Sequence, residues 1–265
     1  MINKLKTKII FSISSMFPLI FKVSQVSRYL SRLSFDKSSS DVYRGVISKR
    51  SKHGSVSAIY RVKNGSATIE ASILSIAPLC SEIIIVDNDS SDKTIEIAER
   101  LKKELSDITS IKIFNYNRKL ALAGYGYKDK VKKDPDASLA KFYTYCFSLG
   151  TRDYVMKCDA HYIFTPRGLI NIQKKLLLNP DIVRFRGAEI FGKYIAYEPF
   201  IMRNNGSFSF VDGDEYEIIK LRNPVKMMDF YKSTIISPCY MHVKRLSYSK
   251  HISKNSSIII EDVYK

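Results

Sequence analysis

The feature that most constrains the fold is a short apolar run that stops abruptly at an acid. Residues 83–86 read Ile-Ile-Ile-Val and are followed directly by Asp87. A continuous apolar run of this length is typical of a strand buried on both faces, as in a parallel sheet. The run therefore predicts an α/β fold, in which ligands bind beyond the carboxyl ends of the strands.

Two strand–loop–helix units follow one another in this part of the chain. Residues 56–62 are rich in β-branched and aromatic side chains, and isoleucines at helical spacing come after a turn containing Asn64-Gly65. Asp87 and Asp89 open the loop after the second strand, where a nucleotide would be held in an open α/β sheet. Taken alone, such a loop more often supplies only helix caps and turns.

Residues 56–105, taken together, resemble the opening of the glycosyltransferase family 2 domain, which has the GT-A fold. In that family the first strand ends near an Arg/Lys-Asn pair and the second in the pattern VDN-S-D-T, present here as VDNDSSDKT. The resemblance implies a Rossmann-like, mostly parallel sheet flanked by helices. It also implies that Asp87 contacts the uracil or ribose of a sugar nucleotide, and that Arg61 and Asn64 line the same pocket. One departure is Gly65, where the family usually has an acid.

A further polar pair ends the apolar strand 154–158. Asp159 and His161 stand where the family usually carries Asp-x-Asp, in a setting, YVMKCDAHYIF, that otherwise resembles its own. The resemblance implies that both bind a divalent cation, that Lys157 lies in the nucleotide-sugar pocket and that His242 is a third metal ligand. Imidazole suits Mn²⁺ better than Mg²⁺, so Mn²⁺ is favoured. An isolated Asp-x-His would more often be a surface turn.

The catalytic base is expected in the second half of the domain. Two alternating runs flank an acidic cluster with Asp214 and Glu215, and the Asp-Gly pair within it is typical of a hairpin turn. An inverting transferase needs a carboxylate to take the proton of the acceptor hydroxyl. We predict Asp214 and Glu215 for this role, with Glu189 in reserve. The alternative is that the cluster only forms the turn.

Basic charge is concentrated at the N-terminal end. The chain has 43 Lys and Arg against 26 acids, and its first 54 residues hold eleven of the former and two of the latter. Apolar residues recur there at helical spacing, which predicts a basic amphipathic helical extension over residues 1–33 that docks on an anionic membrane or on protein. The predicted organisation is an extension and Ser-rich linker at 1–54 and a GT-A domain at 55–265, divided into a nucleotide-sugar half (55–165) and an acceptor half (166–265).

The remaining composition favours a cytoplasmic protein that can sit on the inner face of the cell membrane. The longest nearly uncharged stretch, residues 9–21, is too short to span a bilayer. The four cysteines are far apart and show no CxxC spacing, which argues against a disulfide framework and a zinc site and favours a reducing compartment.

These features predict an inverting, metal-dependent glycosyltransferase of surface polysaccharide or lipopolysaccharide synthesis. Its donor would be a nucleotide sugar, with a UDP-sugar favoured, and its acceptor a glycan or a lipid-linked molecule. One alternative is a catalytically degenerate GT-A carbohydrate-binding protein, with Gly65 and His161 as its signs. Another is a nucleic-acid-binding protein, favoured by the pI of 9.6. The sequence holds no RNP, zinc-finger or helix-turn-helix motif, so no nucleic acid partner is expected.

Overall fold

The computed structural model describes residues 37–189, 195–222 and 227–244, and only the backbone of 37–40 and 227–229. Contacts divide the chain into two units, residues 1–41 and 42–265, and the second holds nearly all of the described residues. The predicted amphipathic extension, residues 1–33, lies outside them. Within the described part, no helix combines the length and the apolar character needed to span a membrane.

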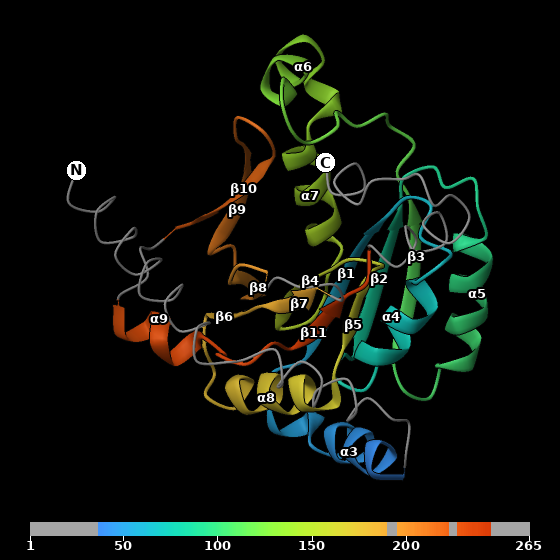
Figure 1. Ribbon diagram of the computed structural model, residues 1–265, viewed down its shortest axis with the longest axis vertical. Coiled ribbons are helices and arrows are strands. Elements are labelled where there is room, and N and C mark those ends of the chain that lie inside the picture. Colours follow the sequence, from blue (N-terminus) through green and yellow to red (C-terminus); the bar gives the residue numbers. More distant parts are fainter. Residues whose placement is uncertain (1–36, 190–194, 223–226, 245–265) are drawn as a thin grey trace, which may run out of the picture. The chain divides into compact units, whose positions relative to one another are not determined.

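A six-stranded sheet forms the centre of the second unit (Figure 1). Four neighbouring strands run parallel, and the last two are antiparallel to their neighbours. The predicted fold class, an α/β fold with a mostly parallel sheet flanked by helices, is therefore confirmed. In sheet order the strands are β3 (Ser110–Asn115), β2 (Glu82–Asp87), β1 (Val56–Val62), β4 (Tyr154–Cys158), β8 (Glu198–Arg203) and β6 (Ile182–Phe185).

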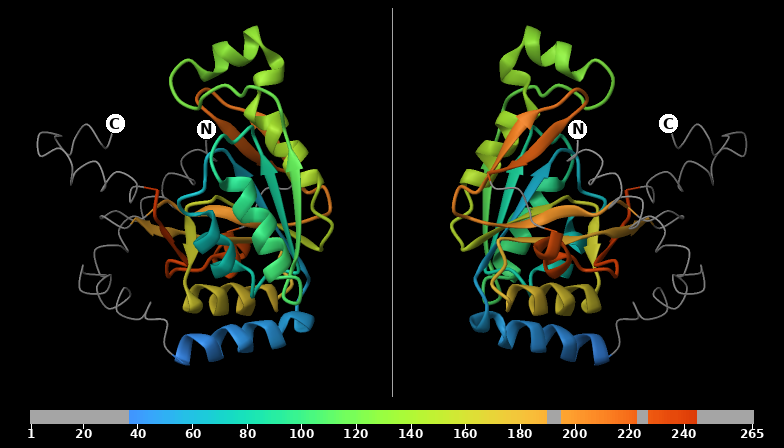
Figure 2. Two further views of the ribbon diagram at one scale, coloured as in Figure 1. Left: turned by 90° about the vertical axis from the view of Figure 1, so that its right-hand side faces the viewer. Right: turned by 90° about the vertical axis from the view of Figure 1, so that its left-hand side faces the viewer.

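Hydrophobic layers cover both faces of this sheet, which is why β1 and β2 are buried at every position. Alternate strand residues such as Tyr60 and Ile59 belong to two different clusters, one on each face. Figure 2 shows the sheet between its flanking helices. One face packs on α4 (Ile69–Ile76), α5 (Thr94–Glu104) and α8 (Pro166–Leu176), and the other on α7 (Leu139–Ser148) and a hairpin of β9 (Phe208–Asp212) and β10 (Glu217–Leu221).

A second, three-stranded sheet brings distant segments of the chain together. Its central strand β11 (Tyr240–His242) pairs antiparallel with β5 (Tyr162–Phe164) and parallel with β7 (Gly187–Glu189). Close packing explains Gly168 at the start of α8, since a Cβ there would lie 2.1 Å from the Cys239 carbonyl oxygen. The short helix α9 (Met227–Ser233) precedes β11 along the chain.

The expected linker before the domain is wrong over part of its length. Helix α3 (Lys37–Ser48) occupies much of residues 34–54, and the short 3-10 helix η2 (Arg50–Lys52) follows it. Val46 is 1% exposed, and Val42 and Tyr43 pack against the same core as the sheet. The Ser-rich composition hid these apolar residues, which share one helical face.

Two further short helices follow β3. The chain leaves the sheet at Asn115 and forms α6 (Tyr127–Lys133) and the 3-10 helix η3 (Pro135–Ala137) before α7. Tyr127 is fully buried in a small cluster with Ala121 and Ala137. Its hydroxyl donates a hydrogen bond to Asp212, which joins α6 to the hairpin.

Candidate functional site

The parallel register places the ends of three strands at one edge of the sheet. Val62 at the end of β1 pairs with Asp87 at the end of β2, and Tyr60 pairs with Cys158 at the end of β4. Asp159 follows Cys158 directly and therefore lies beside Arg61, the next residue of β1. The predicted strand-end residues are thus neighbours in space.

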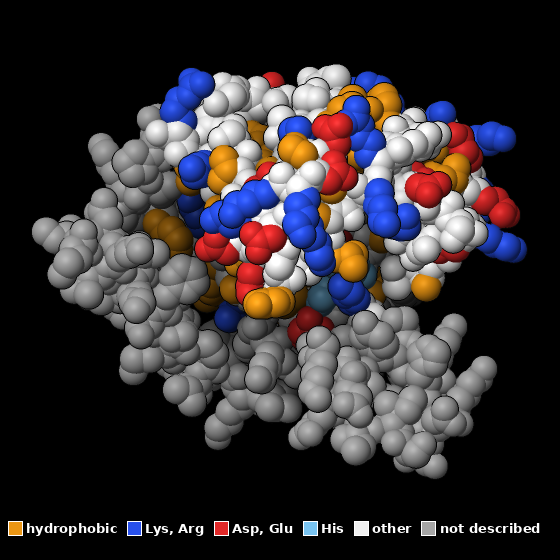
Figure 3. Space-filling model, turned by 90° about the horizontal axis from the view of Figure 1, so that it is seen from above, with side chains coloured by type: hydrophobic (Ala, Val, Ile, Leu, Met, Phe, Trp, Pro, Cys, Tyr) orange, Lys and Arg blue, Asp and Glu red, His pale blue; other side chains and the backbone are white. Residues whose placement is uncertain are grey.

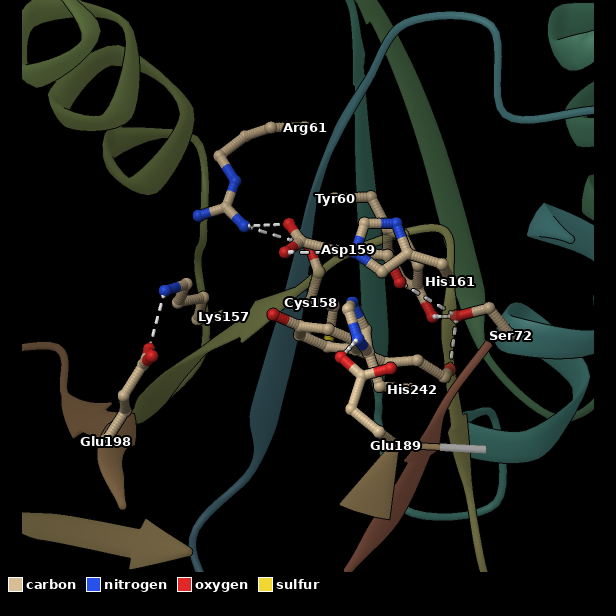
Figure 4. Close-up of polar contacts among 11 residues, drawn as sticks. Tyr60, Arg61, Ser72, Lys157, Cys158, Asp159, His161, Glu189, Glu198 and His242 are labelled. Carbon is tan, nitrogen blue, oxygen red and sulfur yellow. Dashed lines mark hydrogen bonds and ion pairs between the residues drawn. The ribbon is translucent and has the colours of Figure 1, made fainter. Parts of the chain in front are cut away.

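Arg61 and Asp159 form a buried ion pair (Figure 4). The Arg61 side chain is 3% exposed and that of Asp159 is 22% exposed. The guanidinium lies 4.1 Å from the centroid of the Tyr143 ring and also donates to the Cys158 carbonyl oxygen at 3.2 Å. Helix α7, which carries Tyr143, therefore holds the arginine from the opposite side.

Several neighbours together set the ionisation of Asp159. Burial is the largest single influence and would raise the pKa of the Asp159 carboxyl, but the charge of Arg61, that of Lys157 and smaller contributions together hold the pKa well below its ordinary value. For His161 the pKa is lowered to about 4, mainly by burial; the attraction of Asp159 opposes this shift, and the positive groups nearby add to it. At neutral pH the site thus presents an ionised carboxylate beside a neutral imidazole.

The small sheet supplies the other half of the site. Parallel pairing of β11 with β7 sets His242 beside Glu189, and their side chains are joined by a 2.5 Å hydrogen bond from His242 Nδ1 to Glu189 Oε1. The His161 and His242 rings lie 4.6 Å apart between centroids, and His161 Nε2 is 3.9 Å from Asp159 Oδ2. Figure 4 shows these four side chains converging.

A serine that the sequence analysis did not single out fixes the backbone of the Asp-x-His turn. Ser72 Oγ lies 3.1 Å from the Asp159 carbonyl oxygen and 2.7 Å from that of Tyr162. The Tyr60 hydroxyl contacts the same serine at 3.0 Å. Ser72 and Tyr60 are both buried, so residues of α4 and β1 fix the turn from the protein interior.

Lys157 is engaged by a residue that the sequence analysis also missed. Its Nζ lies 2.8 Å from Glu198 Oε2, at the start of β8. The Lys157 side chain is mostly buried, and its ammonium is 5.9 Å from the Phe200 ring. No strand was predicted over 198–203, so nothing in the sequence pointed to Glu198.

The loops after β1 and β2 are bound to each other. Asn64 Oδ1 accepts from the Ser91 backbone N–H at 2.8 Å, and the Asn64 backbone N–H donates to Ser90 Oγ. Asp87 is 5% exposed, and one of its oxygens accepts from the Ser90 N–H at 3.0 Å. The other, Oδ1, is buried with no hydrogen-bond partner in the described part of the chain. Asp89 is exposed with φ 60° at the loop's outer side.

The departure at Gly65 has a steric cause. A Cβ at this position would lie 2.7 Å from Val62 Cγ2 and 3.0 Å from the Ala160 Cβ. The turn after β1 packs directly against the residue that follows Asp159. A larger side chain at position 65 would therefore overlap Val62 and crowd the Asp-x-His segment.

Asp214 and Glu215 are not brought to this cluster. They lie in the β9–β10 turn, which extends beside α6 (Figure 1), and both are exposed. The Asp214 carboxylate pairs with Lys128 Nζ at 2.6 Å, and the Glu215 carbonyl accepts from the Gly124 N–H at 2.7 Å. Their observed contacts are those of a turn docked on α6, whereas Glu189 lies within the cluster.

The donor types present fit a divalent cation, but the site is not preformed. One carboxylate and two imidazoles match the ligand preferences of Mn²⁺, and the Glu189 hydrogen bond would leave His242 Nε2 available to an ion. Among the described residues, however, no three His, Cys, Asp or Glu side chains are gathered as metal binding requires. Binding would need Asp159, His161 and His242 to draw closer together.

Comparisons with known proteins give structural matches only. No family model matches the chain, and no curated protein matches it. Residues 1–349 of S. aureus TarS align with 12% identity and a TM-score of 0.48, covering 74% of this chain and 62% of that one. Glucosyl-3-phosphoglycerate synthase from Mycobacterium tuberculosis, in complex with Mn²⁺, UDP-glucose and phosphoglyceric acid, aligns with 18% identity and a TM-score of 0.35, covering 57% and 49%. The chain thus spans less than two thirds of either structure.

Proposed function

We propose that the protein is a glycosyltransferase with a nucleotide-sugar donor. The observation that supports this best is the convergence of Arg61, Asp159, His161 and His242 at the carboxyl edge of the sheet, next to the buried Asp87. A diphosphate needs positive charge or a cation, and a nucleoside needs a buried acceptor for its donor groups. Asp87 would supply the buried acceptor, and Asp159, His161 and His242 are side chains of the kinds that hold a cation.

The proposed nucleoside site is centred on Asp87. Its Oδ1 is buried and has no hydrogen-bond partner among the residues that the structure describes, which is costly unless a ligand donates a hydrogen bond to it. The base N–H or the ribose hydroxyl of a uridine would satisfy it, and we therefore favour a UDP-sugar. Asn64 acts through the loop that it holds to Ser91, while Asp89 and Lys157 would contact outer parts of the donor.

We propose Asp159, His161 and His242 as the residues that would hold a divalent cation, with Mn²⁺ favoured by the two imidazoles. When bound, the ion neutralises charge on the departing diphosphate. Arg61 occupies only one oxygen of Asp159, so Oδ2 stays available on the side of His161. Glu189 fixes the ring orientation of His242.

The proposed reaction inverts the sugar's anomeric centre. The acceptor hydroxyl oxygen bonds to the anomeric carbon while the bond from that carbon to the diphosphate oxygen breaks, and the nucleoside diphosphate leaves with the electron pair. The hydroxyl proton passes to a carboxylate. We assign this role to Glu189, whose Oε2 has no partner among the described residues. Asp214 and Glu215 remain the alternative.

The acceptor is proposed from the sequence and from the charge of the N-terminal end. We infer a glycan or a lipid-linked acceptor of surface polysaccharide or lipopolysaccharide synthesis, at the inner face of the cell membrane. This inference rests on the resemblance of residues 56–105 to the transferase family and on the basic charge of residues 1–54. A lipid-linked acceptor would require the enzyme to work at an anionic interface.

Thermal unfolding tests the proposal, because a ligand that binds only the folded state raises the melting temperature. The full chain would be titrated with UDP-, GDP-, CMP- and dTDP-sugars, each with Mn²⁺ or with EDTA. We expect a shift for one nucleotide, dependent on Mn²⁺, that Asp87→Asn abolishes. The matched control Asp107→Asn changes an exposed acid before β3 and should keep the shift.

Other results of the thermal-unfolding titration would contradict specific parts of the proposal. A shift that is unchanged in EDTA would contradict the metal assignment. Donor binding without hydrolysis or transfer would favour the degenerate carbohydrate-binding protein. A chain that no sugar nucleotide stabilises would refute the proposed function.

A further inference from the structure

A rigid, basic projection lies beyond the carboxyl ends of the parallel strands. We call residues 118–133 the tip segment; it follows β3 and includes α6 (Figure 1). It holds six Lys and Arg and one acid. Asp87 and Asp159 follow strands that end at the same edge of the sheet, so the segment lies on the side where the candidate site opens.

The tip segment presents two large apolar side chains to solvent. Leu122 is 77% exposed and Tyr125 is 99% exposed. Gly124 and Gly126 on either side of Tyr125 have φ of 110° and 75°, a backbone region that favours glycine, and open space surrounds both. The glycines are therefore explained by the turn that directs Tyr125 outward.

Several contacts make this turn a fixed structure. The Ala121 N–H donates to the Ala137 carbonyl at 2.9 Å, and the Gly124 N–H donates to the Glu215 carbonyl at 2.7 Å. Tyr127 anchors the base of the turn because its ring is buried and its hydroxyl bonds to Asp212. The exposed Leu and Tyr are thus held out by an ordered base.

The tip segment that carries the apolar pair also carries exposed lysines. Lys119, Lys130 and Lys133 are exposed and have no ion-pair partner in the described part of the chain, whereas Lys128 pairs with Asp214. Viewed from above, the molecule displays Lys and Arg side chains beside hydrophobic ones, with acids between them (Figure 3). The lysines alone could bind a soluble polyanion, but such a ligand would leave Leu122 and Tyr125 exposed to water.

We propose that the tip segment docks on an anionic lipid surface. Leu122 and Tyr125 would enter the interfacial region, where an amphipathic tyrosine is favoured, while the three unpaired lysines contact lipid phosphates. Docking would hold the site's open edge toward the membrane. The tip segment is separate in sequence from residues 1–33, and its docking requires neither donor binding nor catalysis.

A polarity-sensitive fluorophore on the full chain tests this contact directly. All four native cysteines are buried, and burial raises the pKa of Cys80 and Cys146 to about 12, so an introduced exposed thiol is labelled selectively. Ala123→Cys places the probe between Leu122 and Tyr125. Ser106→Cys, exposed between α5 and β3 at the opposite edge of the sheet, is the matched control.

We expect a blue shift of the probe at position 123 with phosphatidylcholine vesicles containing phosphatidylglycerol, and none at position 106. Pure phosphatidylcholine should give little change. Equal shifts at both positions, no binding to vesicles, or vesicle binding with the probe at 123 still in water would each overturn the proposal. A response to inorganic polyphosphate but not to vesicles would identify a soluble polyanion instead.

Charge variants provide a second measurement. Replacing Lys119, Lys130 and Lys133 by Gln should weaken vesicle binding about a hundredfold, since each lysine near an anionic surface contributes about fivefold. The control, Gln at positions 49, 93 and 103, removes three exposed lysines elsewhere. An equal loss in both triple variants would show that net charge, rather than the tip segment, drives binding and would refute the assignment.

Discussion

The Arg61–Asp159 pair makes a prediction about stability as well as activity. From sequence alone, Asp159 is a strand-end ligand whose loss should affect only the reaction. In the structure its carboxylate compensates a guanidinium that is 3% exposed. Asp159→Asn would leave that charge buried, with the Cys158 carbonyl and the Tyr143 and Phe147 rings near it but without a carboxylate partner.

The expected loss of stability in Asp159→Asn follows from the burial of Arg61 and Asp159. Removing one member of a buried ion pair typically costs about 3–5 kcal/mol. Asp159 is itself 22% exposed, so we place the expected loss in the free energy of unfolding at the lower end, about 3 kcal/mol. The matched control is Asp214→Asn, whose ion pair with Lys128 is exposed and should contribute nothing measurable.

Urea unfolding of a double-mutant cycle measures the interaction. Arg61→Met, Asp159→Asn and the double variant would be compared with the native chain at pH 7. We expect the double variant to be clearly more stable than the sum of the two losses predicts, because it removes both charges. Additive losses, or an Asp159→Asn protein as stable as the Asp214→Asn control, would refute the ion-pair argument.

The Arg61–Asp159 pair also makes the stability of the folded protein depend on pH. The pKa of Asp159 is lowered in the folded state, so its contribution is present above the unfolded-state pKa of 3.8 and is lost as the pH falls through the folded value. The difference between native and Asp159→Asn proteins should therefore shrink below about pH 4. A difference that stays constant to pH 2 would contradict the assigned cause.

Three other residues give simpler predictions about stability. Glu82→Gln should lower the free energy of unfolding by about 2 kcal/mol at neutral pH, because its hydrogen bonds hold the Glu82 pKa at about 2. In urea unfolding this loss of stability should disappear between pH 4.5 and 2. A loss that is unchanged at pH 2 would argue against the assigned cause. Gly65→Asp should lower the melting temperature through its clash with Val62, and a Gly65→Asp protein at least as stable as the native chain would show that reasoning to be wrong. Gly168→Ala should prevent native folding, seen as loss of cooperative unfolding, because its Cβ would overlap the Cys239 carbonyl.

Local signals made several elements predictable. The strand at residues 83–86 and the turn after it needed only an apolar run and a polar stop, and β2 ends at the predicted Asp87. Helix α8 carries a local start signal of the same kind, with Thr165 accepting from the Gly168 N–H and a proline in the first turn. In each case the information lies within a few residues of the element.

Strand β8 shows why other parts could not be predicted. Its sequence contains Pro199, which cannot donate to a ladder and argues against an interior strand. The register between β6 and β8 shifts at Val183/Arg184, opposite the proline, and this irregularity lets the strand lie between β4 and β6. Glu198 reaches Lys157 only because of this tertiary pairing.

The choice of the candidate base differs between sequence and structure. The sequence favours Asp214 and Glu215, whereas the burial and contacts of Glu189 favour Glu189. Asp214 and Glu215 attract attention because two acids stand together, but a tight turn needs polar, exposed residues and explains them fully. Glu189 stands alone in the sequence, 53 residues from the histidine that binds it. Its Oε2 is buried and has no hydrogen-bond partner among the described residues, which is costly, and the proposed roles of proton acceptor and orienting partner for His242 would account for that cost. Only the parallel pairing of β7 with β11 makes these roles visible.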